Sequence, residues 1–197
     1  MNVGVVAVQG AVSEHVTAFE LAMANLGVRG SVVAVRTPAG LAKVDALALP
    51  GGESTTISKL LIKSGLFDSI ISRALDGMPV LGTCAGLVLL AKEGDAQVGK
   101  TATKLLGLMD MRVSRNAFGR QRESFEAPVK LTGLRGGPFP AVFIRAPAIE
   151  SVRGGCKPLA LLEGRIVAAQ QGAITALAFH PELSGDLRIH ERFVSRV

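Results

Sequence analysis

The sequence predicts a three-layer α/β protein with a mostly parallel central sheet and helices on both faces. The first observation is a series of short apolar runs, such as VGVVAV at 3–8, which are typical of strands buried on both faces. The second is that helical patterns separate these runs, as in parallel sheets. The third is a hydrophobic content of 48%, which is sufficient for a full core.

In the first half of the chain, the predicted strands and helices alternate in order. After the strand at 3–8, residues 13–27 place apolar side chains at helical spacing, and Gly27 can end that helix. The same alternation then continues. We expect further strands at 31–36, 45–52 and 78–82, and helices at 55–74, interrupted near Gly65, and from 85 to 93.

The second half predicts short strands joined by turns and one closing helix. The expected strands lie at 125–131, 141–146, 158–172, with a hairpin turn within 162–166, and 174–180, and the helix at 185–197. Pro128 cannot donate to a ladder, so its strand is expected at an edge. We therefore predict a flavodoxin-like three-layer sandwich with an added antiparallel region in the second half.

Composition and charge exclude several classes of protein. The net charge is +6, but there is no Trp or Tyr to stack bases, and Lys and Arg are spread along the chain. One local basic cluster consists of Arg112, Arg115, Arg120 and Arg122. We predict no nucleic-acid partner; a basic face fits an acidic protein or an anionic substrate equally well.

The expected cellular location of the protein follows from features that the sequence lacks. No apolar stretch reaches the roughly 18 residues that span a bilayer, and the N-terminus lacks the basic region of a signal peptide. Cys84 and Cys156 alone cannot form a disulfide framework. We expect a cytoplasmic protein without membrane association, and we expect Cys156 in a loop or at the surface.

Cys84 lies where a predicted strand meets a predicted helix, in the pentapeptide Gly-Thr-Cys-Ala-Gly at 82–86. Glycines two residues before and after a nucleophile allow a sharp turn between strand and helix. The N-terminus of the following helix favours a thiolate. The pattern therefore favours a nucleophile over the alternative, a small cysteine buried in the core.

His180 is the best candidate for the base that such a nucleophile needs. It ends an apolar run and precedes Pro181, which favours an extended backbone, so Glu182 is expected on the same side as the imidazole. The alternative is a surface turn. Of the other histidines, His15 lies early in a predicted helix, and His190 is expected on a solvated face of the last helix.

The third feature is the glycine loop LPGGEST at 49–55. Its backbone N–H groups can approach a ligand, and an N–H from Gly52 together with one from Ala85 could bind an oxyanion. The alternatives are a plain turn or a phosphate loop, but the phosphate-loop pattern of glycines followed by Lys and Ser or Thr is absent. Two isolated cysteines do not make a zinc site, so no metal is expected.

These features resemble the class I, triad-type glutamine amidotransferases. Longer strings resemble one branch of them, the glutaminase subunits of pyridoxal 5′-phosphate synthases, from about residue 3 to about residue 195. The strings that carry this resemblance are VQGAVSEH at 8–15, LPGGESTTISKL at 49–60, GTCAGLVLLAKE at 82–93, RNAFGRQRESFEA at 115–127, VFIRAP at 142–147 and GRIVAAQQG at 164–172.

The resemblance implies a catalytic role for each residue of a triad. Cys84 attacks the carboxamide of L-glutamine and forms a glutamyl thioester, His180 transfers protons, and Glu182 orients His180. The amides of Gly52 and Ala85 stabilise the tetrahedral intermediate. The resemblance assigns glutamine binding to Gly52, Glu53, Ser54, Arg115, Ile144 and Arg145.

The resemblance also implies partners. Ammonia passes to a separate synthase subunit within a large hetero-oligomer, and Gln9 contacts that subunit and helps to organise the oxyanion hole. Residues 1–197 would form a single amidotransferase domain, without cofactor or metal. Two alternatives remain at this point: a glutaminase subunit of another amidotransferase pathway, or a non-catalytic binding module on the same fold.

Overall fold

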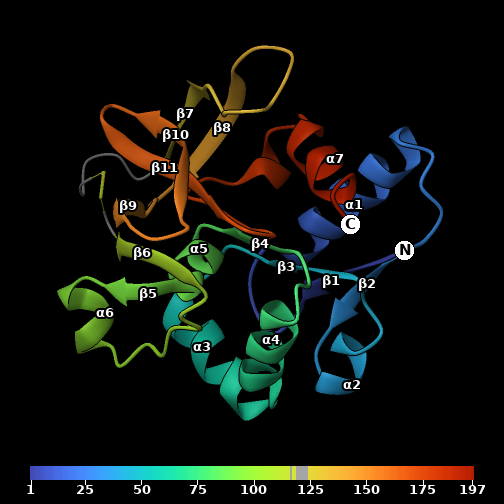
Figure 1. Cartoon of the computed structure of the whole chain (residues 1–197), viewed down its shortest axis with the longest axis horizontal. Coiled ribbons are helices and arrows are strands. Elements are labelled where there is room, and N and C mark those ends of the chain that lie inside the picture. The colour runs from blue at the N-terminus through green and yellow to red at the C-terminus, as the bar shows by residue number, and fades with distance from the viewer. Residues whose placement is uncertain (116, 119–123) are drawn as a thin grey trace.

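The computed structural model describes residues 1–115, 117–118 and 124–197 (Figure 1). Arg120 and Arg122 of the basic cluster, and part of the string at 115–127, lie outside the described residues. The strands are β1 (Asn2–Val6), β2 (Ser31–Val35), β3 (Ala46–Leu49), β4 (Val80–Thr83), β5 (Ala91–Gly94), β6 (Met109–Ser114), β7 (Ser124–Val129), β8 (Phe139–Ile144), β9 (Ala148–Val152), β10 (Lys157–Leu162), β11 (Arg165–Gln171) and β12 (Ile174–Leu177). The helices are α1 (Val12–Asn25), α2 (Pro38–Leu41), α3 (Ser54–Lys63), α4 (Leu66–Leu75), α5 (Ala85–Leu90), α6 (Ala96–Lys100) and α7 (Arg188–Val194), with a short 3₁₀ helix, η1 (Pro181–Leu183).

A ten-stranded sheet forms the centre of the described structure, in the order β2-β1-β3-β4-β12-β11-β9-β6-β5, with β10 paired to β11. The pairs from β2 across to β12 are parallel, whereas β12, β11, β9 and β6 pair antiparallel to one another. Helices α1 and α7 pack together on one side of the sheet, and α3 and α4 lie on the other (Figure 1). The predicted α/β sandwich with an antiparallel region is confirmed.

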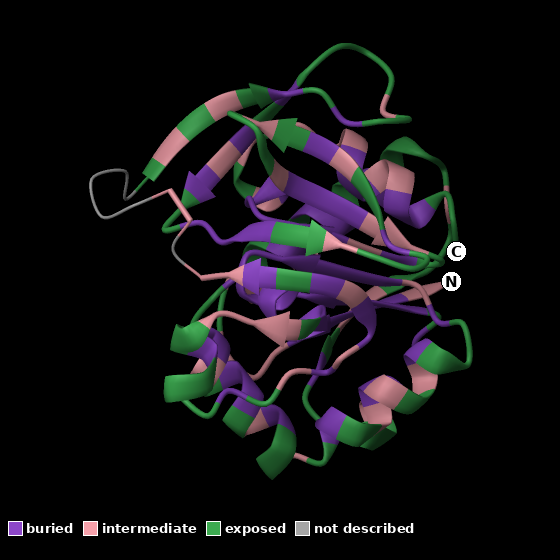
Figure 2. Cartoon of the chain, turned by 60° about the vertical axis from the view of Figure 1, so that its left-hand side comes forward, coloured by how far each residue is buried: buried purple, intermediate pink, exposed green. Residues whose placement is uncertain are grey.

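The predicted core strands are buried because both of their faces are covered by helices. Val3, Val5 and Val6 of β1 are fully buried, as are Leu47 and Ala48 of β3. Figure 2 shows that buried residues follow the sheet, whereas exposed residues lie on the outward sides of the helices. Among the described residues, no helix combines the length and apolar character needed to cross a bilayer.

The helical region 55–74 divides at Gly65, as predicted. Gly65 has a φ of 74°, in the left-handed region that glycine adopts without strain, and α4 begins directly after it. The helix expected at 85–93 is shorter than predicted: it ends at Leu90, and Ala91 starts β5. All residues from 85 to 91 are buried, so the sequence offered no apolar periodicity to mark this boundary.

Pro128 lies in β7, which pairs in register with β8 as a separate two-stranded sheet. Pro128 stands opposite Pro140, so two residues without N–H groups face each other at this position. The predicted edge position of this strand therefore agrees with the pairing found among the described residues.

Two expectations about side chains near the end of the chain do not hold in full. Cys156 lies in a loop before β10, as expected, but it is not at the surface: it is 4% exposed and packs into the core beside a turn in which its N–H donates to the carbonyl of Arg153. His190 is fully buried, because α7 packs against α1 and the imidazole meets the ring of Phe19 edge-on, with 4.8 Å between centroids.

Candidate active site

Cys84 occupies the sharp turn between β4 and α5. Its φ of 49° and ψ of −101° lie outside the regions that L-residues usually adopt, a strain that is found at functional sites. A Cβ on Gly82 would lie 2.8 Å from the backbone of Gly86, and one on Gly86 would lie 2.1 Å from the carbonyl oxygen of Leu49. Both glycines are therefore required for β4 and α5 to meet at this angle.

Gly86→Ala should lower the free energy of unfolding by about 2–3 kcal/mol, because the added methyl group meets rigid backbone and not a flexible side chain. Urea denaturation of the purified chain measures this change. Gly99→Ala in α6 is the matched control, since its Cβ would have no neighbour within 4 Å. It should be neutral or stabilising by up to about 1 kcal/mol. An equal loss in both variants would contradict the steric argument.

The structure brings His180 and Glu182 to Cys84. His180 follows β12 and places Nδ1 2.8 Å from Glu182 Oε1. A Cβ on Gly51 would lie 2.3 Å from His180 Cε1 and 3.3 Å from Cys84 Cβ, so the bare backbone of Gly51 leaves space for both. The sequence predicted an extended backbone after His180. The chain instead turns into η1, and this turn brings Glu182 back towards the imidazole.

The charges in this group depend on its hydrogen bonds. Burial lowers the pKa of His180, but hydrogen bonds to Cys84 and Glu182 outweigh it and raise the pKa to about 10. Burial raises the pKa of Glu182, but its hydrogen bond with His180 and the nearby imidazoles hold that pKa below its usual value. At neutral pH the imidazole of His180 is therefore protonated, and it lies between the sulfur of Cys84 and the charged carboxylate of Glu182.

Gln9 and the glycine loop are joined by hydrogen bonds. Gln9 Oε1 accepts from the N–H of Glu53 at 2.9 Å, and a Cβ on Gly52 would lie 2.6 Å from the same oxygen. The N–H of Ala11 donates to the carbonyl of Gly51 at 3.1 Å. The segment between β1 and α1 therefore fixes the backbone of the glycine loop beside Cys84.

A cavity of about 460 Å³ opens beside Cys84. The predicted residues among its lining are Gly52, Glu53, Ser54, Cys84, Ala85, Arg115 and Arg145. The predicted residue Ile144 does not line the cavity, but its carbonyl oxygen lies 3.9 Å from Cys84 Sγ. Sequence reasoning missed Gln97, Lys100 and Thr101, because α6 was not predicted. Asp95, whose side chain caps α6, was the available signal for that helix.

Arg115 and Glu53 form an ion pair at this cavity. Arg115 Nη2 lies 3.0 Å from Glu53 Oε1, and Glu53 also caps α3 by accepting from the N–H groups of Thr55 and Thr56. Burial raises the pKa of Glu53, but the hydrogen bonds from Thr55 and Thr56 outweigh it and lower the pKa to about 2. The cavity thus presents one fixed cation next to one fixed anion, which suits a zwitterionic ligand.

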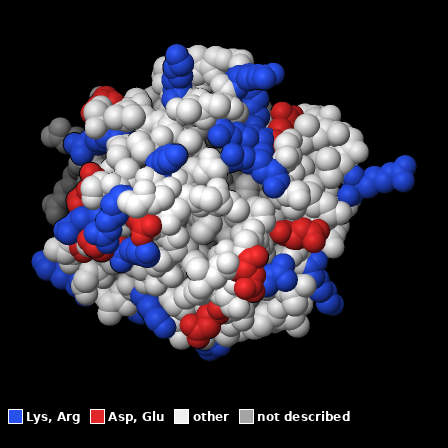
Figure 3. Space-filling model, viewed as in Figure 1, with Lys and Arg blue, Asp and Glu red and all other residues white. Residues whose placement is uncertain are grey.

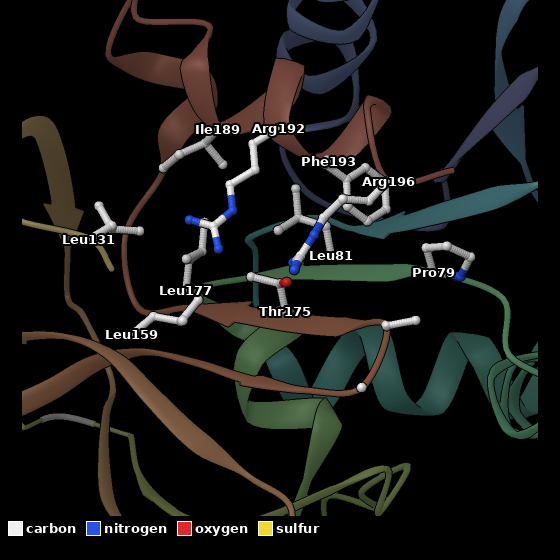
Figure 4. Close-up of a pocket in the computed structure, with 12 residues that line it drawn as sticks. Pro79, Leu81, Leu131, Leu159, Thr175, Leu177, Ile189, Arg192, Phe193 and Arg196 are labelled. Atoms are coloured by element: carbon white, nitrogen blue, oxygen red, sulfur yellow. The ribbon is translucent and has the colours of Figure 1, made fainter. Parts of the chain in front are cut away.

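Two other features of the surface lie outside this group. A cavity of about 290 Å³ lies near the start of β4 and β12; Figure 4 shows the guanidinium groups of Arg192 and Arg196 beside Leu81 and Leu177, and no residue of the group around Cys84 lines it. Figure 3 shows basic side chains scattered over one face with acidic side chains between them. Within the described part of the chain, no three His, Cys, Asp or Glu side chains gather as a metal site would require.

The fold and this site together define a class: an α/β protein with a cysteine at a strained strand–helix turn, beside a histidine and a carboxylate. Comparison with known families agrees with that class. The model of the SNO glutamine amidotransferase family matches residues 5–197. The chain belongs to this family.

The chain is also similar to relatives that have curated names. The chain is 53% identical over 197 residues to pyridoxal 5′-phosphate synthase subunit PdxT of Methanosarcina mazei, covering 100% of this chain and 98% of the relative. It is 56% identical over 194 residues to the protein of the same name from Archaeoglobus fulgidus, covering 98% and 97%.

Solved structures give a consistent result. A crystal structure described as a glutamine amidotransferase superposes with a TM-score of 0.85 at 42% identity, covering 98% of this chain and 97% of the other. A glutamine amidotransferase from Thermotoga maritima, at 16% identity and a TM-score of 0.64, shares the fold and covers 100% and 83%.

Proposed function

We propose that this chain is the glutaminase subunit of a pyridoxal 5′-phosphate synthase. It hydrolyses L-glutamine to L-glutamate and ammonia and passes the ammonia to a separate synthase subunit. The observation that carries this proposal is the contact of Cys84, His180 and Glu182 at the mouth of a cavity, in a chain about half identical to named PdxT subunits.

The positions of these side chains support the following reaction. The sulfur of Cys84 attacks the carboxamide carbon, and the carbonyl oxygen becomes an oxyanion beside the N–H groups of Gly52 and Ala85. His180 gives its proton to the departing nitrogen, so the C–N bond breaks, ammonia leaves and a glutamyl thioester remains. His180 then takes a proton from water, which attacks the thioester, releases glutamate and restores the cysteine.

Glutamine is a zwitterion, and the cavity offers matching charges. Arg115 and Arg145 can receive its carboxylate, whereas Glu53 and the backbone carbonyl groups near Ile144 can accept from its ammonium. Because Arg115 is already paired with Glu53, the substrate inserts into an existing ion pair, which fixes both side chains before binding. Ser54 lies at the start of α3, where its backbone N–H is available to the ligand.

The partner is the synthase subunit, bound in a large hetero-oligomer near Gln9. Gln9 holds the N–H of Glu53, next to Gly52, so a partner that moves the β1–α1 segment also moves a proposed oxyanion donor. Glutamine hydrolysis by the isolated chain should therefore be slow.

The decisive experiment is a glutaminase assay of the chain alone and with its cognate synthase subunit. We expect an increase of at least tenfold in glutamate release when the subunit is added. A matched control adds the partner of a different glutamine amidotransferase, which should give no increase. If an unrelated amidotransferase partner activates the chain and the pyridoxal synthase subunit does not, the assignment of the pathway is wrong.

A further inference from the structure

Two buried histidines lie behind the proposed triad. His15 in α1 and His190 in α7 are both fully buried, and neither lines the cavity beside Cys84. A buried imidazole has two ring nitrogens whose hydrogen bonds must be satisfied, so the contacts of these two side chains carry information about their protons.

His15 contacts the far oxygen of Glu182. His15 Nε2 lies 3.3 Å from Glu182 Oε2 and 3.0 Å from Thr83 Oγ1, and His15 Nδ1 lies 3.3 Å from His190 Nε2. Glu182 Oε1 is already bonded to His180. No hydrogen bond of regular geometry reaches Oε2 from the described residues, so the 3.3 Å approach of His15 Nε2 is the polar contact of this buried oxygen. The carboxylate of Glu182 therefore lies between two imidazoles, one on each oxygen.

Both histidines are neutral in this environment. Burial lowers the pKa of His15, although the charge of Glu182 opposes this, and the nearby His180 lowers it further. Burial and the proximity of His15 lower the pKa of His190 to about 3. Glu14 on the same helix only weakly raises the pKa of His15. Each imidazole therefore carries one proton, and its tautomer is a defined property.

Two arrangements of these protons can be compared, and one of them costs less. If His15 carries its proton on Nε2, that N–H lies between Thr83 Oγ1 at 3.0 Å and the charged Glu182 Oε2 at 3.3 Å, and Nδ1 accepts from the Nε2–H of His190. The His190 Nδ1 atom, for which the described residues provide no hydrogen-bonding partner, is then an unpaired acceptor. In the opposite arrangement, His190 Nδ1 is a buried donor without an acceptor, and a lone pair of His15 faces the charged oxygen of Glu182. Both features are costly, so the first arrangement is favoured.

We propose that His15 is a positioning residue for the triad: its Nε2–H holds Glu182 Oε2, and His190 fixes the tautomer of His15 that can do so. The inference rests on the proposed glutaminase function for its effect on rate. With both oxygens held, the carboxylate plane cannot rotate away from His180. Without His15, Glu182 keeps one hydrogen-bonding partner and gains rotational freedom, so fewer molecules have His180 correctly oriented.

Kinetics of the chain with its synthase subunit test the role of His15. His15→Phe fills the space beside Phe19 but removes the donor, and should lower kcat about tenfold to a hundredfold while KM changes less than about twofold. His15→Gln places an amide N–H near the position of Nε2 and should recover most of kcat. Met23→Ala, a buried change in the same helix away from Glu182, should lower stability but leave kcat unchanged.

The kinetic result that would overturn the proposal is a parental kcat in His15→Phe, or an equal loss of kcat in His15→Phe, His15→Gln and Met23→Ala. The latter result would indicate a general effect of packing. Chemical denaturation of each variant accompanies the assay, so that a variant that fails to fold is recognised.

Nitrogen NMR of the unmodified chain gives a test that requires no activity. We expect His15 and His190 both in the Nε2–H tautomer and both neutral at pH 7. A neutral Nδ1–H tautomer at His15, or a protonation of either side chain near pH 6.5, would overturn the proposal. If the chain shows these tautomers but does not hydrolyse glutamine with its partner, the proposed function is wrong and the hydrogen-bonded chain of histidines stands.

Discussion

Cys84→Ala should abolish glutamine hydrolysis, both by the isolated chain and with the synthase subunit. The sulfur is the only atom of this side chain that can form the thioester, and the mechanism has no other route to break the amide bond. Residual hydrolysis should fall to the background of the assay. Glutamate release under saturating glutamine measures this, and labelling with a diazo-ketone analogue of glutamine should lose its adduct at residue 84.

The same variant has a second readout that does not depend on activity. Two of the interactions that raise the pKa of His180 come from Cys84, so the pKa should fall from about 10 when the sulfur is removed. A histidine NMR titration follows this change. The fold should persist, because alanine takes up the same backbone position. Cys156→Ala, in the other buried cysteine, is the matched control and should keep full activity. Activity at the parental rate in Cys84→Ala would show that the nucleophile lies elsewhere.

Glu182→Gln should lower kcat by about a factor of 10³ to 10⁴, the scale of amide substitutions at the third position of other catalytic triads. One oxygen of the Glu182 carboxylate faces His180 Nδ1, and the other faces His15 Nε2. Both carboxylate oxygens are acceptors. An amide has one acceptor and one donor group, so one of the two imidazole N–H groups loses its acceptor. KM should change little, because Glu182 does not line the substrate cavity.

The control for Glu182→Gln is Glu150→Gln. Glu150 forms an exposed ion pair with Arg112, so its substitution should leave kcat unchanged and alter the free energy of unfolding by less than about 1 kcal/mol. A loss of less than tenfold in Glu182→Gln would contradict the assignment of Glu182 as the residue that orients His180. In that case Glu182 would have only a structural role.

The sequence was informative wherever the chemistry is local. The glycines at 82 and 86 indicated a sharp strand–helix turn around Cys84, and the structure shows that a Cβ at either position would meet backbone. His180 and Glu182 are separated by one residue, so their contact could be predicted from the chain itself. The predicted backbone conformation after His180 was nevertheless wrong. A 3₁₀ helix, η1, replaces the expected extended segment, and Pro181 is its first residue.

The sequence was less informative where burial removes periodicity. The buried run through 85–91 joins α5 to β5 without a polar residue to separate them, and β6, β9 and α6 were missed altogether. The absence of α6 from the prediction also hid the part of the cavity that contains Gln97, Lys100 and Thr101. A short helix with one capping residue, Asp95, gives too weak a local signal to identify its place beside the site.

Local signals in the sequence were enough to predict the α/β class, the turn around Cys84 and the candidate residues that accompany it. These follow from apolar periodicity and backbone sterics, which act over a few residues. Contacts across long separations, such as Glu182 with His15 and His15 with His190, could be found only in the folded chain. Their contact depends on α1 packing against η1 and α7, and the burial that results makes the tautomer of each histidine matter.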